Sequence, residues 1–355
     1  MSDTYNELYN EILGENKLKT YYKFSDFEYN VKGKERILSN ISQLDYMIKG
    51  FELGCVTIWT GVTNMGKSTV LTKIAKESLL QNEKIFFFNG EQTKDDFKNN
   101  LYKQFAPRDK IYKKQYKNTN IYDYYVEDFY SRYLSGLYDN KIFVYNNDVI
   151  KTIDMLIGAM TECLKQGVRV FIIDNFMQID IPSENIFQEQ TRIAESLRTF
   201  AVNNNVHVHL VAHPKKIEDR QIRLSLYDIS GSMNLVNKAY NVISIIRVDR
   251  LDDESREYEG LKKAMLDNRY DINETSTILE VLKEKGNGCG VVGLKYDTLQ
   301  RTFTEQHKIE ENKYNAIMKI KNEEKQLAEL EKIEKRNKKL EKYKNMGWRY
   351  DRKCN

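Results

Sequence analysis

The feature that most constrains this chain is residues 61–68, which read Gly-Val-Thr-Asn-Met-Gly-Lys-Ser. The octapeptide matches G-x-x-x-x-G-K-S, and it stands between an apolar run at 56–60 and a helix-like stretch at 69–78. A phosphate-binding loop requires this order, because a strand delivers the glycines and the following helix points its first N–H groups at the phosphates. The chain is therefore predicted to contain a P-loop core of the α/β class.

The side chains of this loop indicate which part of a nucleotide each would bind. Lys67 would bring its ammonium group to the β- and γ-phosphates, and the Ser68 hydroxyl would be a ligand of Mg²⁺. ATP and Mg²⁺ are thus the expected cofactors. The residues expected to surround the nucleotide are Gly61, Asn64, Met65, Gly66, Lys67, Ser68 and Thr69.

Composition limits the class of protein. The 355 residues suit one large α/β domain with appendages or two modest domains. Basic and acidic residues nearly cancel, 56 against 52, so any nucleic-acid-binding charge must be local. The four cysteines show no C-x-x-C spacing, which is typical of reduced intracellular thiols. No apolar run approaches the ~18 residues of a membrane span and no signal peptide is apparent, so the protein is expected in the cytoplasm, that of a host cell if it is viral.

Three further strand-like runs end in polar residues that are expected near the phosphates. The run at 84–89 leads to Glu91, whose carboxylate could polarise a water molecule facing the γ-phosphate, or could be a plain surface group. The β-branched run at 168–174 ends in Asp174, the Walker B pattern that delivers a carboxylate to Mg²⁺. The run at 206–214 brings His213 to the same crevice. Since these strands alternate with helices, a mostly parallel, helix-covered sheet is predicted.

A histidine cluster in the same strand raises the question of a zinc site. His207 and His209 share one strand face and His213 ends the strand. No cysteine or carboxylate stands at ligand spacing, so the pattern favours core histidines over metal ligands.

Residues 93–140 are rich in tyrosine and lysine. Such a mixture could form a stacking platform for single-stranded nucleic acid. The commoner arrangement is a helical insert with half-buried tyrosines and solvated lysines, and the sequence is interpreted here in that way.

The two ends of the chain leave alternatives open. Residues 5–13 form a short amphipathic stretch that is either part of a frayed tail or a helix docking on a neighbouring subunit. Strands at 277–283 and 290–296 look like a final hairpin. Residues 306–355 are densely charged and predict a long helix, which could be a coiled coil, a partner-binding arm or a solvated helix. Glu323 and Glu324 interrupt its apolar seam and disfavour the coiled coil.

Taken in order, these motifs resemble the RecA-like motor domain of hexameric replicative DNA helicases of the DnaB, Twinkle and phage primase-helicase types. The resemblance rests on the entry into the P-loop at 41–61, Phe-Phe-Asn-Gly-Glu at 87–91, Phe-Ile-Ile-Asp-Asn at 171–175, the strand at 207–213 and the segment 227–235. It covers about residues 35–305. The domain boundaries expected from it are an N-terminal segment 1–35, a motor domain 36–305 and a C-terminal arm 306–355.

The resemblance implies roles for individual residues. Glu91 would be the catalytic base, and His213 would sense the γ-phosphate and signal to a DNA-binding loop at about 214–226. A cation from the next subunit would complete the site, either Arg247 or the pair Lys283 and Lys285. Relatives usually carry Lys-x-Arg there, and a lysine lacks the planar bidentate geometry of arginine. The residues expected to contact DNA phosphates are Lys215, Lys216, Arg220 and Arg223.

The activity implied is that of an ATP-dependent, ring-forming helicase, a hexamer in this family, that translocates on single-stranded DNA and unwinds forked duplexes. The region lacks a primase domain, as in a phage-type motor, and its arm could recruit a primase or polymerase. Two alternatives remain open at this point. One is a RecA/RadA-like recombinase, and the other is an ATP-switched assembly or loader factor that does not translocate.

Overall fold

The computed structural model describes residues 23, 33–90, 93–117, 119–120, 122–181, 185–215, 221–230, 233–284 and 288–345. The chain divides into two compact units, Met1–Glu35 and Arg36–Asn355, and the second contains the fold described below. The amphipathic stretch predicted at residues 5–13 lies outside the described residues.

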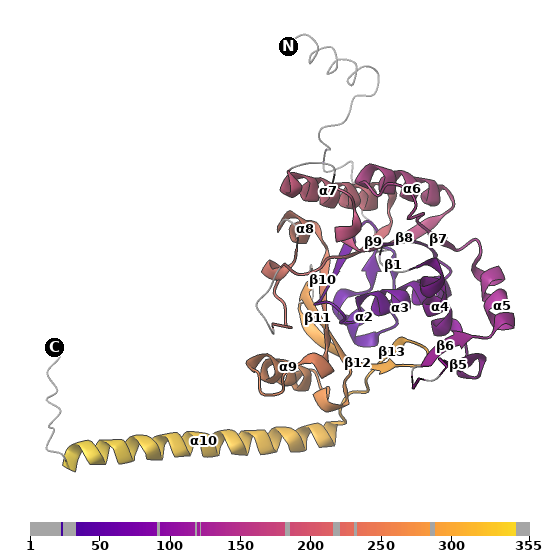
Figure 1. Cartoon of the computed structure of the whole chain (residues 1–355). Coiled ribbons are helices and arrows are strands. Elements are labelled where there is room, and N and C mark those ends of the chain that lie inside the picture. The colour runs from indigo at the N-terminus through magenta and orange to yellow at the C-terminus, as the bar shows by residue number, and fades with distance from the viewer. Residues whose placement is uncertain are drawn as a thin grey trace, which may run out of the picture. The chain divides into compact units, whose positions relative to one another are not determined.

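The second unit is built on a nine-stranded sheet with the order β13-β12-β11-β10-β3-β9-β8-β4-β7 (Figure 1). Every neighbouring pair from β10 to β7 is parallel, and the pairs from β10 to β13 are antiparallel. The predicted, mostly parallel sheet is confirmed. In chain order its strands are β3 (Val56–Thr60), β4 (Lys84–Asn89), β7 (Ile142–Val144), β8 (Val168–Asp174), β9 (His207–Val211), β10 (Asn241–Arg247), β11 (Thr277–Lys283), β12 (Gly290–Asp297) and β13 (Thr302–Glu305).

Helices cover both faces of this sheet, and a separate apolar cluster fills each interface. Successive strand residues point to opposite faces, so Phe87 joins one cluster while Phe86 and Phe88 join the other. Because both faces are buried, the parallel strands read as continuous apolar runs. The helices of the first face are α2 (Ser42–Ile48), α3 (Lys67–Leu80), α4 (Lys94–Phe105), α5 (Asp128–Tyr138) and α9 (Arg256–Asp267), and those of the second are α6 (Ile153–Lys165), α7 (Ile186–Asn204) and α8 (Met233–Lys238).

Three local predictions were wrong in part. Residues 37–50 read as one capped helix in the sequence, but the helix is limited to α2, because β1 (Arg36–Ile37) pairs with β2 (Phe51–Glu52) on either side of it. The predicted hairpin of 277–283 and 290–296 is confirmed as β11 and β12, but it is not final, since β13 pairs with β12. The tyrosine-rich insert is not wholly helical, because an antiparallel hairpin of β5 (Ile111–Gln115) and β6 (Tyr122–Val126) separates α4 from α5. Its alternating aromatic side chains favour a pleated strand.

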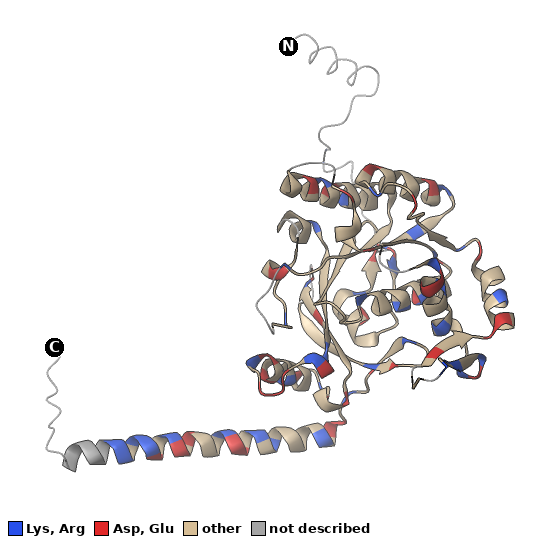
Figure 2. Cartoon of the chain, in the orientation of Figure 1, with Lys and Arg blue, Asp and Glu red and all other residues tan. Residues whose placement is uncertain are grey.

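The long charged C-terminal helix is confirmed as α10 (Glu311–Asn345). Acidic and basic residues alternate along it (Figure 2), and its side chains described to residue 339 are exposed, except for the half-buried Tyr314, Ile317 and Met318. A helix with so little buried surface is stabilised mainly by its own hydrogen bonds and local ion pairs. None of the helices in the described ranges combines the length and apolarity that a bilayer crossing needs.

Two of the clustered histidines are hydrogen-bonded inside the core. His207 lies 2.7 Å from the Glu52 carbonyl through Nδ1 and 3.0 Å from Thr57 Oγ1 through Nε2, and the Trp59 indole donates to Nδ1 of His209 at 3.2 Å. Both rings are buried. Burial lowers the pKa of His207 to about 4 and holds the pKa of His209 well below its usual value.

This burial predicts acid sensitivity of the fold. Between the unfolded pKa of 6.5 and the folded pKa of about 4, the unfolded chain binds more protons at His207. The free energy of unfolding should therefore fall as the pH drops through 6.5, by on the order of 3 kcal/mol at pH 4 from this residue. Thermal unfolding of His207→Gln from pH 7.5 to 4.5 should show a weaker pH dependence than the unsubstituted protein. His307→Gln, which removes an exposed imidazole, is the control. Equal pH slopes for all three proteins would contradict the assignment.

Candidate active site

The P-loop lies where the sequence predicts it, between the end of β3 and the start of α3. Gly61 has φ +148°, and a Cβ at this position would lie 2.6 Å from the Ile245 carbonyl oxygen of the neighbouring strand. Gly66, at φ +90°, caps the amino end of α3. Glycine is therefore required at Gly61 by both conformation and space, and the loop is free to expose its N–H groups.

Lys67 is the first residue of α3, and its side chain turns back into the loop. Its Nζ donates to the carbonyls of Gly61 and Val62, both at 2.9 Å. Only 7% of the residue is exposed. The ammonium group is thus held above the concave side of the loop, where a point charge would meet phosphate oxygens.

Polar residues at the ends of two neighbouring strands face the same space. Asp174 ends β8, Asn175 follows it, and His213 follows β9. The Asn175 amide nitrogen lies 3.0 Å from Nε2 of His213, while the Asn175 amide oxygen accepts the Met177 N–H at 2.8 Å. With its oxygen so engaged, Asn175 donates to Nε2, which places the ring proton of a neutral His213 on Nδ1. The Walker B strand and the histidine strand are thereby connected.

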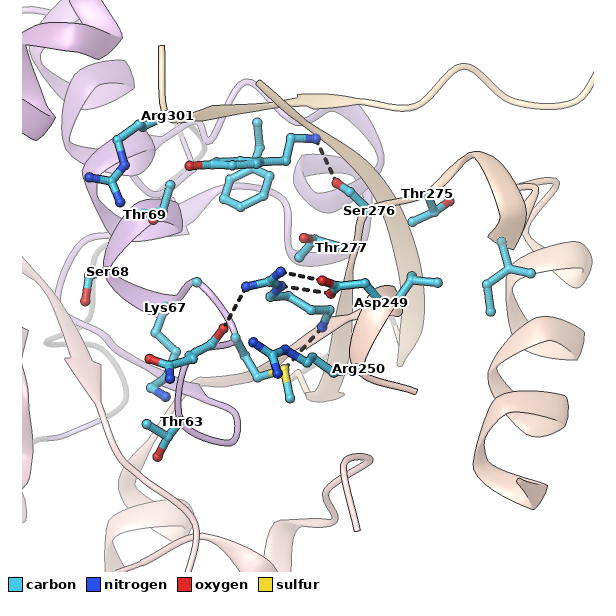
Figure 3. Close-up of a pocket in the computed structure, with 18 of the residues that line it drawn as sticks. Thr63, Lys67, Ser68, Thr69, Asp249, Arg250, Thr275, Ser276, Thr277 and Arg301 are labelled. Atoms are coloured by element: carbon cyan, nitrogen blue, oxygen red, sulfur yellow. Dashed lines mark hydrogen bonds and ion pairs between the residues drawn. The ribbon is translucent and has the colours of Figure 1, made fainter. Parts of the chain in front are cut away.

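Lys67, Asp174 and His213 line one cavity of about 850 Å³, a volume suited to a nucleotide. Figure 3 shows this cavity. Lys67, Ser68 and Thr69 lie on one wall, and Thr275–Thr277 lie across from them. Tyr296, Arg301 and Phe303 from the antiparallel strands also line the cavity, with the Phe303 ring next to Gly66 of the loop. The Tyr296 and Phe303 rings are 5.1 Å apart, and Tyr296 is 37% exposed. These three residues belong to no motif that the sequence reveals, and their only signal was their place in a terminal hairpin.

The residues present fit Mg²⁺ as well as a nucleotide. The Ser68 hydroxyl and the Asp174 carboxylate line the same cavity, and Mg²⁺ prefers such oxygen ligands completed by water and phosphate. Glu91 lies outside the described residues, so its predicted place beside the γ-phosphate stays a prediction.

Arg247, the predicted cation for the next subunit's site, lies beside the P-loop of its own chain. Because β10 is parallel to β3, its end lies at the same sheet edge as the P-loop of the same chain. The Arg247 guanidinium pairs with Asp249 and donates to the Asn64 carbonyl at 3.4 Å, while its backbone N–H lies 3.4 Å from the Met65 sulfur. Arg247 therefore lines its own cavity.

Lys283 lies at the opposite edge of the sheet. β11 runs antiparallel to β10, and Lys283 pairs with Val242 at the start of that strand. Its Nζ donates to the carbonyls of Val236 and Ala239 at 2.7 and 2.9 Å, which caps the carboxyl end of α8. Lys285 lies outside the described residues.

The predicted DNA-binding loop is closed at its base by a bridge between Pro214 and Ile229. Lys215 is exposed, and its Nζ donates to the Tyr227 carbonyl at 2.9 Å. Arg223 is engaged differently, because its guanidinium forms a two-pronged ion pair with Glu280 at 2.6–3.2 Å. A phosphate would have to compete with that carboxylate. Lys216 and Arg220 lie outside the described residues.

Helix α4 holds the turn between β12 and β13 in place. The Gln104 amide donates to the Arg301 carbonyl at 2.8 Å, and the Gln300 amide donates to the Ala106 carbonyl at the same distance. An ion pair between Arg108 and Asp297 adds a third link. The wall of the cavity that carries Tyr296 and Arg301 is thus positioned by the insert that follows β4.

Comparison with known proteins agrees with this arrangement. The family model of the DnaB-like helicase C terminal domain matches residues 37–305. A curated relative, the Twinkle homolog protein, chloroplastic/mitochondrial, of Arabidopsis thaliana, is 30% identical over 105 residues; the match covers 28% of this chain and only 15% of that relative.

Two solved structures share the fold. One is described as an ATPase domain, and it superposes with a TM-score of 0.59 at 16% identity, covering 86% of this chain and 98% of that one. The other, a DnaB-like replicative helicase solved in a study of its interactions with primase, gives a TM-score of 0.60 at 18% identity, covering 86% and 68%.

The position of Arg247 predicts an effect within one chain. Arg247→Ala should weaken binding of a fluorescent ATP analogue ~10- to 100-fold, since a hydrogen bond to a charged group contributes ~1.5–3 kcal/mol. The measurement is equilibrium titration at protein concentrations where sedimentation shows monomers. Arg256→Ala, which removes an exposed arginine of α9, is the matched control. If the variant monomer bound the ATP analogue with unchanged affinity and lost affinity only after assembly, Arg247 would act in a neighbour's site.

Proposed function

The chain belongs to the DnaB-like helicase C-terminal domain family, and from this we propose that it is an ATP-driven replicative DNA helicase. It would assemble as a ring, a hexamer in the simplest case, and translocate on single-stranded DNA to unwind a fork. The observation that carries the proposal is the Asn175–His213 hydrogen bond, because it joins the Walker B strand to the strand that leads into the loop 214–226.

The cavity supplies charge where a triphosphate would lie. Lys67 and Arg247 offer cations, and the loop N–H groups at the start of α3 add the positive end of the helix dipole. Ser68 and Asp174 would hold Mg²⁺, which when bound would neutralise part of the phosphate charge. Glu91, just past the end of β4, is our assignment for the group that activates the attacking water.

The aromatic wall suits the base of the nucleotide. Tyr296 presents an exposed ring backed by Phe303, and Arg301 lies at the same end of the cavity. A purine stacked on Tyr296 would point its phosphates toward Lys67 across the cavity.

His213 is placed to relay the state of the phosphate to DNA. Its side chain contacts Asn175, and its backbone carbonyl accepts the Ser230 N–H at 2.8 Å at the base of the loop. A shift of His213 on loss of the γ-phosphate would therefore move the segment that carries Lys215. We propose Lys215, Lys216 and Arg220 as the phosphate contacts, with Arg223 contributing only if it leaves Glu280.

Assembly would complete the site from a second chain. Lys283 lies at the edge of the sheet opposite the P-loop, and Lys285 comes two residues later in the sequence. We propose that these lysines reach a neighbour's nucleotide in a head-to-tail ring. The DnaB-like relative of known structure was studied with primase, and we propose that α10 offers this chain a comparable site for a primase or polymerase.

Strand separation is the direct test. The protein should separate a forked DNA duplex in the presence of Mg²⁺ and ATP, and Lys67→Ala should abolish both separation and DNA-stimulated hydrolysis, because it removes the charge held above the loop. Release of a labelled strand and of phosphate are the two measurements. Hydrolysis that ignores single-stranded DNA, without strand separation, would refute the helicase and favour an assembly switch. Strand exchange without unwinding would favour a recombinase.

The base-stacking assignment predicts a selective kinetic defect. Tyr296→Ala should raise the KM for ATP about twofold to tenfold, since an aromatic pair contributes ~0.5–1.5 kcal/mol beyond area burial, while kcat changes little. Tyr296→Phe should restore the KM. Tyr227→Ala, which removes an exposed tyrosine outside the cavity, controls for loss of a surface ring when hydrolysis is measured without DNA. A lower kcat with an unchanged KM would contradict the assignment of Tyr296 to binding of the base.

A further inference from the structure

The β5–β6 hairpin has no part in the function proposed so far. It forms a two-stranded sheet apart from the nine-stranded one. Residues 111–126 include five tyrosines and three lysines but a single aspartate, a local net charge of +2 (3 − 1) in a nearly neutral chain. Rings and cations are thus concentrated in one short element.

The hairpin is anchored at its open end. Ile111 and Val126 face each other across the ladder, and both are buried. Tyr124 packs on the core, and its carbonyl accepts from the Asn99 amide of α4 at 3.4 Å. The hairpin is therefore held in place before a partner binds. Binding then requires little loss of conformational entropy in the hairpin.

Its outward face carries exposed aromatic rings. Tyr112 pairs with Tyr125 across the ladder, and their rings stack with centroids 6.0 Å apart and planes 29° apart. Tyr112 is 45% exposed and Tyr116 is 49% exposed. The Asp123 carboxylate accepts from the hydroxyls of Tyr116 and Tyr125, which orients both rings.

The lysines of the hairpin form no ion pairs. No carboxylate among the described residues lies within ion-pair distance of Lys113, Lys114 or Lys117, although Lys114 stands opposite Asp123 in the ladder. Lys114 lies over the Tyr125 ring at 5.7 Å on the outward face, whereas Lys113 and the Tyr122 ring, 3.4 Å apart, belong to the opposite face. The cations therefore stand beside the rings, which is the arrangement that a chain of phosphates and stacked bases requires.

We propose that the outward face of the β5–β6 hairpin is a second binding surface for single-stranded nucleic acid, separate from the loop 214–226. Phosphates would meet Lys114 and Lys117, and bases would stack on Tyr112 and Tyr116. Stacking and phosphate contacts from these four residues make binding tolerant of sequence. The choice of nucleic acid as ligand rests on the proposed helicase function, whereas the surface itself rests on the hairpin's geometry and charge.

Anisotropy titration of a labelled oligothymidine of about 20 nucleotides with the full chain tests the rings. Alanine at both Tyr112 and Tyr116 should weaken binding ~5- to 100-fold, the range for losing stacking on about one base. Tyr112→Phe alone should bind normally, because it keeps a ring. Tyr46→Ala removes a 78%-exposed tyrosine of α2 and serves as the matched control. ATP hydrolysis without DNA reports that each variant is folded.

The salt dependence of the same titration tests the lysines. Glutamine at both Lys114 and Lys117 should reduce the slope of log K against log salt by ~1.4, since each lost phosphate contact on a single strand contributes ~0.7. Lys262→Gln, on α9, should leave the slope unchanged.

Photocrosslinking of iodouracil-substituted oligothymidine to the unsubstituted protein gives an answer that needs no variant. Crosslinked peptides from residues 111–126 are expected. This inference alone would be overturned if the hairpin variants bound normally and crosslinks appeared only elsewhere, while the protein still unwound forks. The hairpin would then be a protein-docking surface. No binding of oligothymidine by the unsubstituted protein would instead remove the helicase proposal itself.

Discussion

The structure depends on the parallel hydrogen bonding of β3 with β9 on one side and β10 on the other. Parallel pairing brings the carboxyl ends of strands that are far apart in sequence to one edge. That edge holds the P-loop, Asp174, His213 and Arg247, so one cavity receives a lysine, a carboxylate, an imidazole and a guanidinium from four strands. The same rule sends Lys283, on an antiparallel strand, to the other edge. Strand direction thus decides which cations can serve the chain's own nucleotide.

Much of this could be predicted from local sequence. The P-loop, the strand ending in Asp174 and the strand before His213 each combine a short apolar run with a polar terminus, and each is where the pattern indicates. The position of Arg247 beside the P-loop of its own chain could not be read from the sequence, because the end of a strand does not reveal which strand lies beside it. Tyr296 and Arg301 were missed for a related reason, since they join the cavity only through antiparallel strands beyond β10.

The insert shows how cross-strand contacts override a compositional interpretation. Alternating tyrosines and lysines can solvate one side of a helix, but here the rings of Tyr112 and Tyr125 stack only because the two strands pair. The pattern of residue types along one segment does not reveal which strands pair. The buried Ile111–Val126 pair, which fixes the register, lies at the two ends of the segment. The excess of lysines over carboxylates, in contrast, can be read from the sequence. In the fold, Lys113, Lys114 and Lys117 form no ion pair with a described residue.

The hairpin and the nucleotide cavity share a support. Arg108, in the short turn that leads into β5, pairs with Asp297, while Gln104 of α4 holds the Arg301 carbonyl. Tyr296 lies in β12 just before the same turn, and Arg301 ends that turn. A single-stranded nucleic acid bound to the hairpin would therefore act on the β12–β13 turn, which positions Tyr296. This effect would not pass through His213. The insert is thus connected to the cavity by a route that is separate from the one through His213, because the first reaches the cavity through the β12–β13 turn and the second through the end of β9.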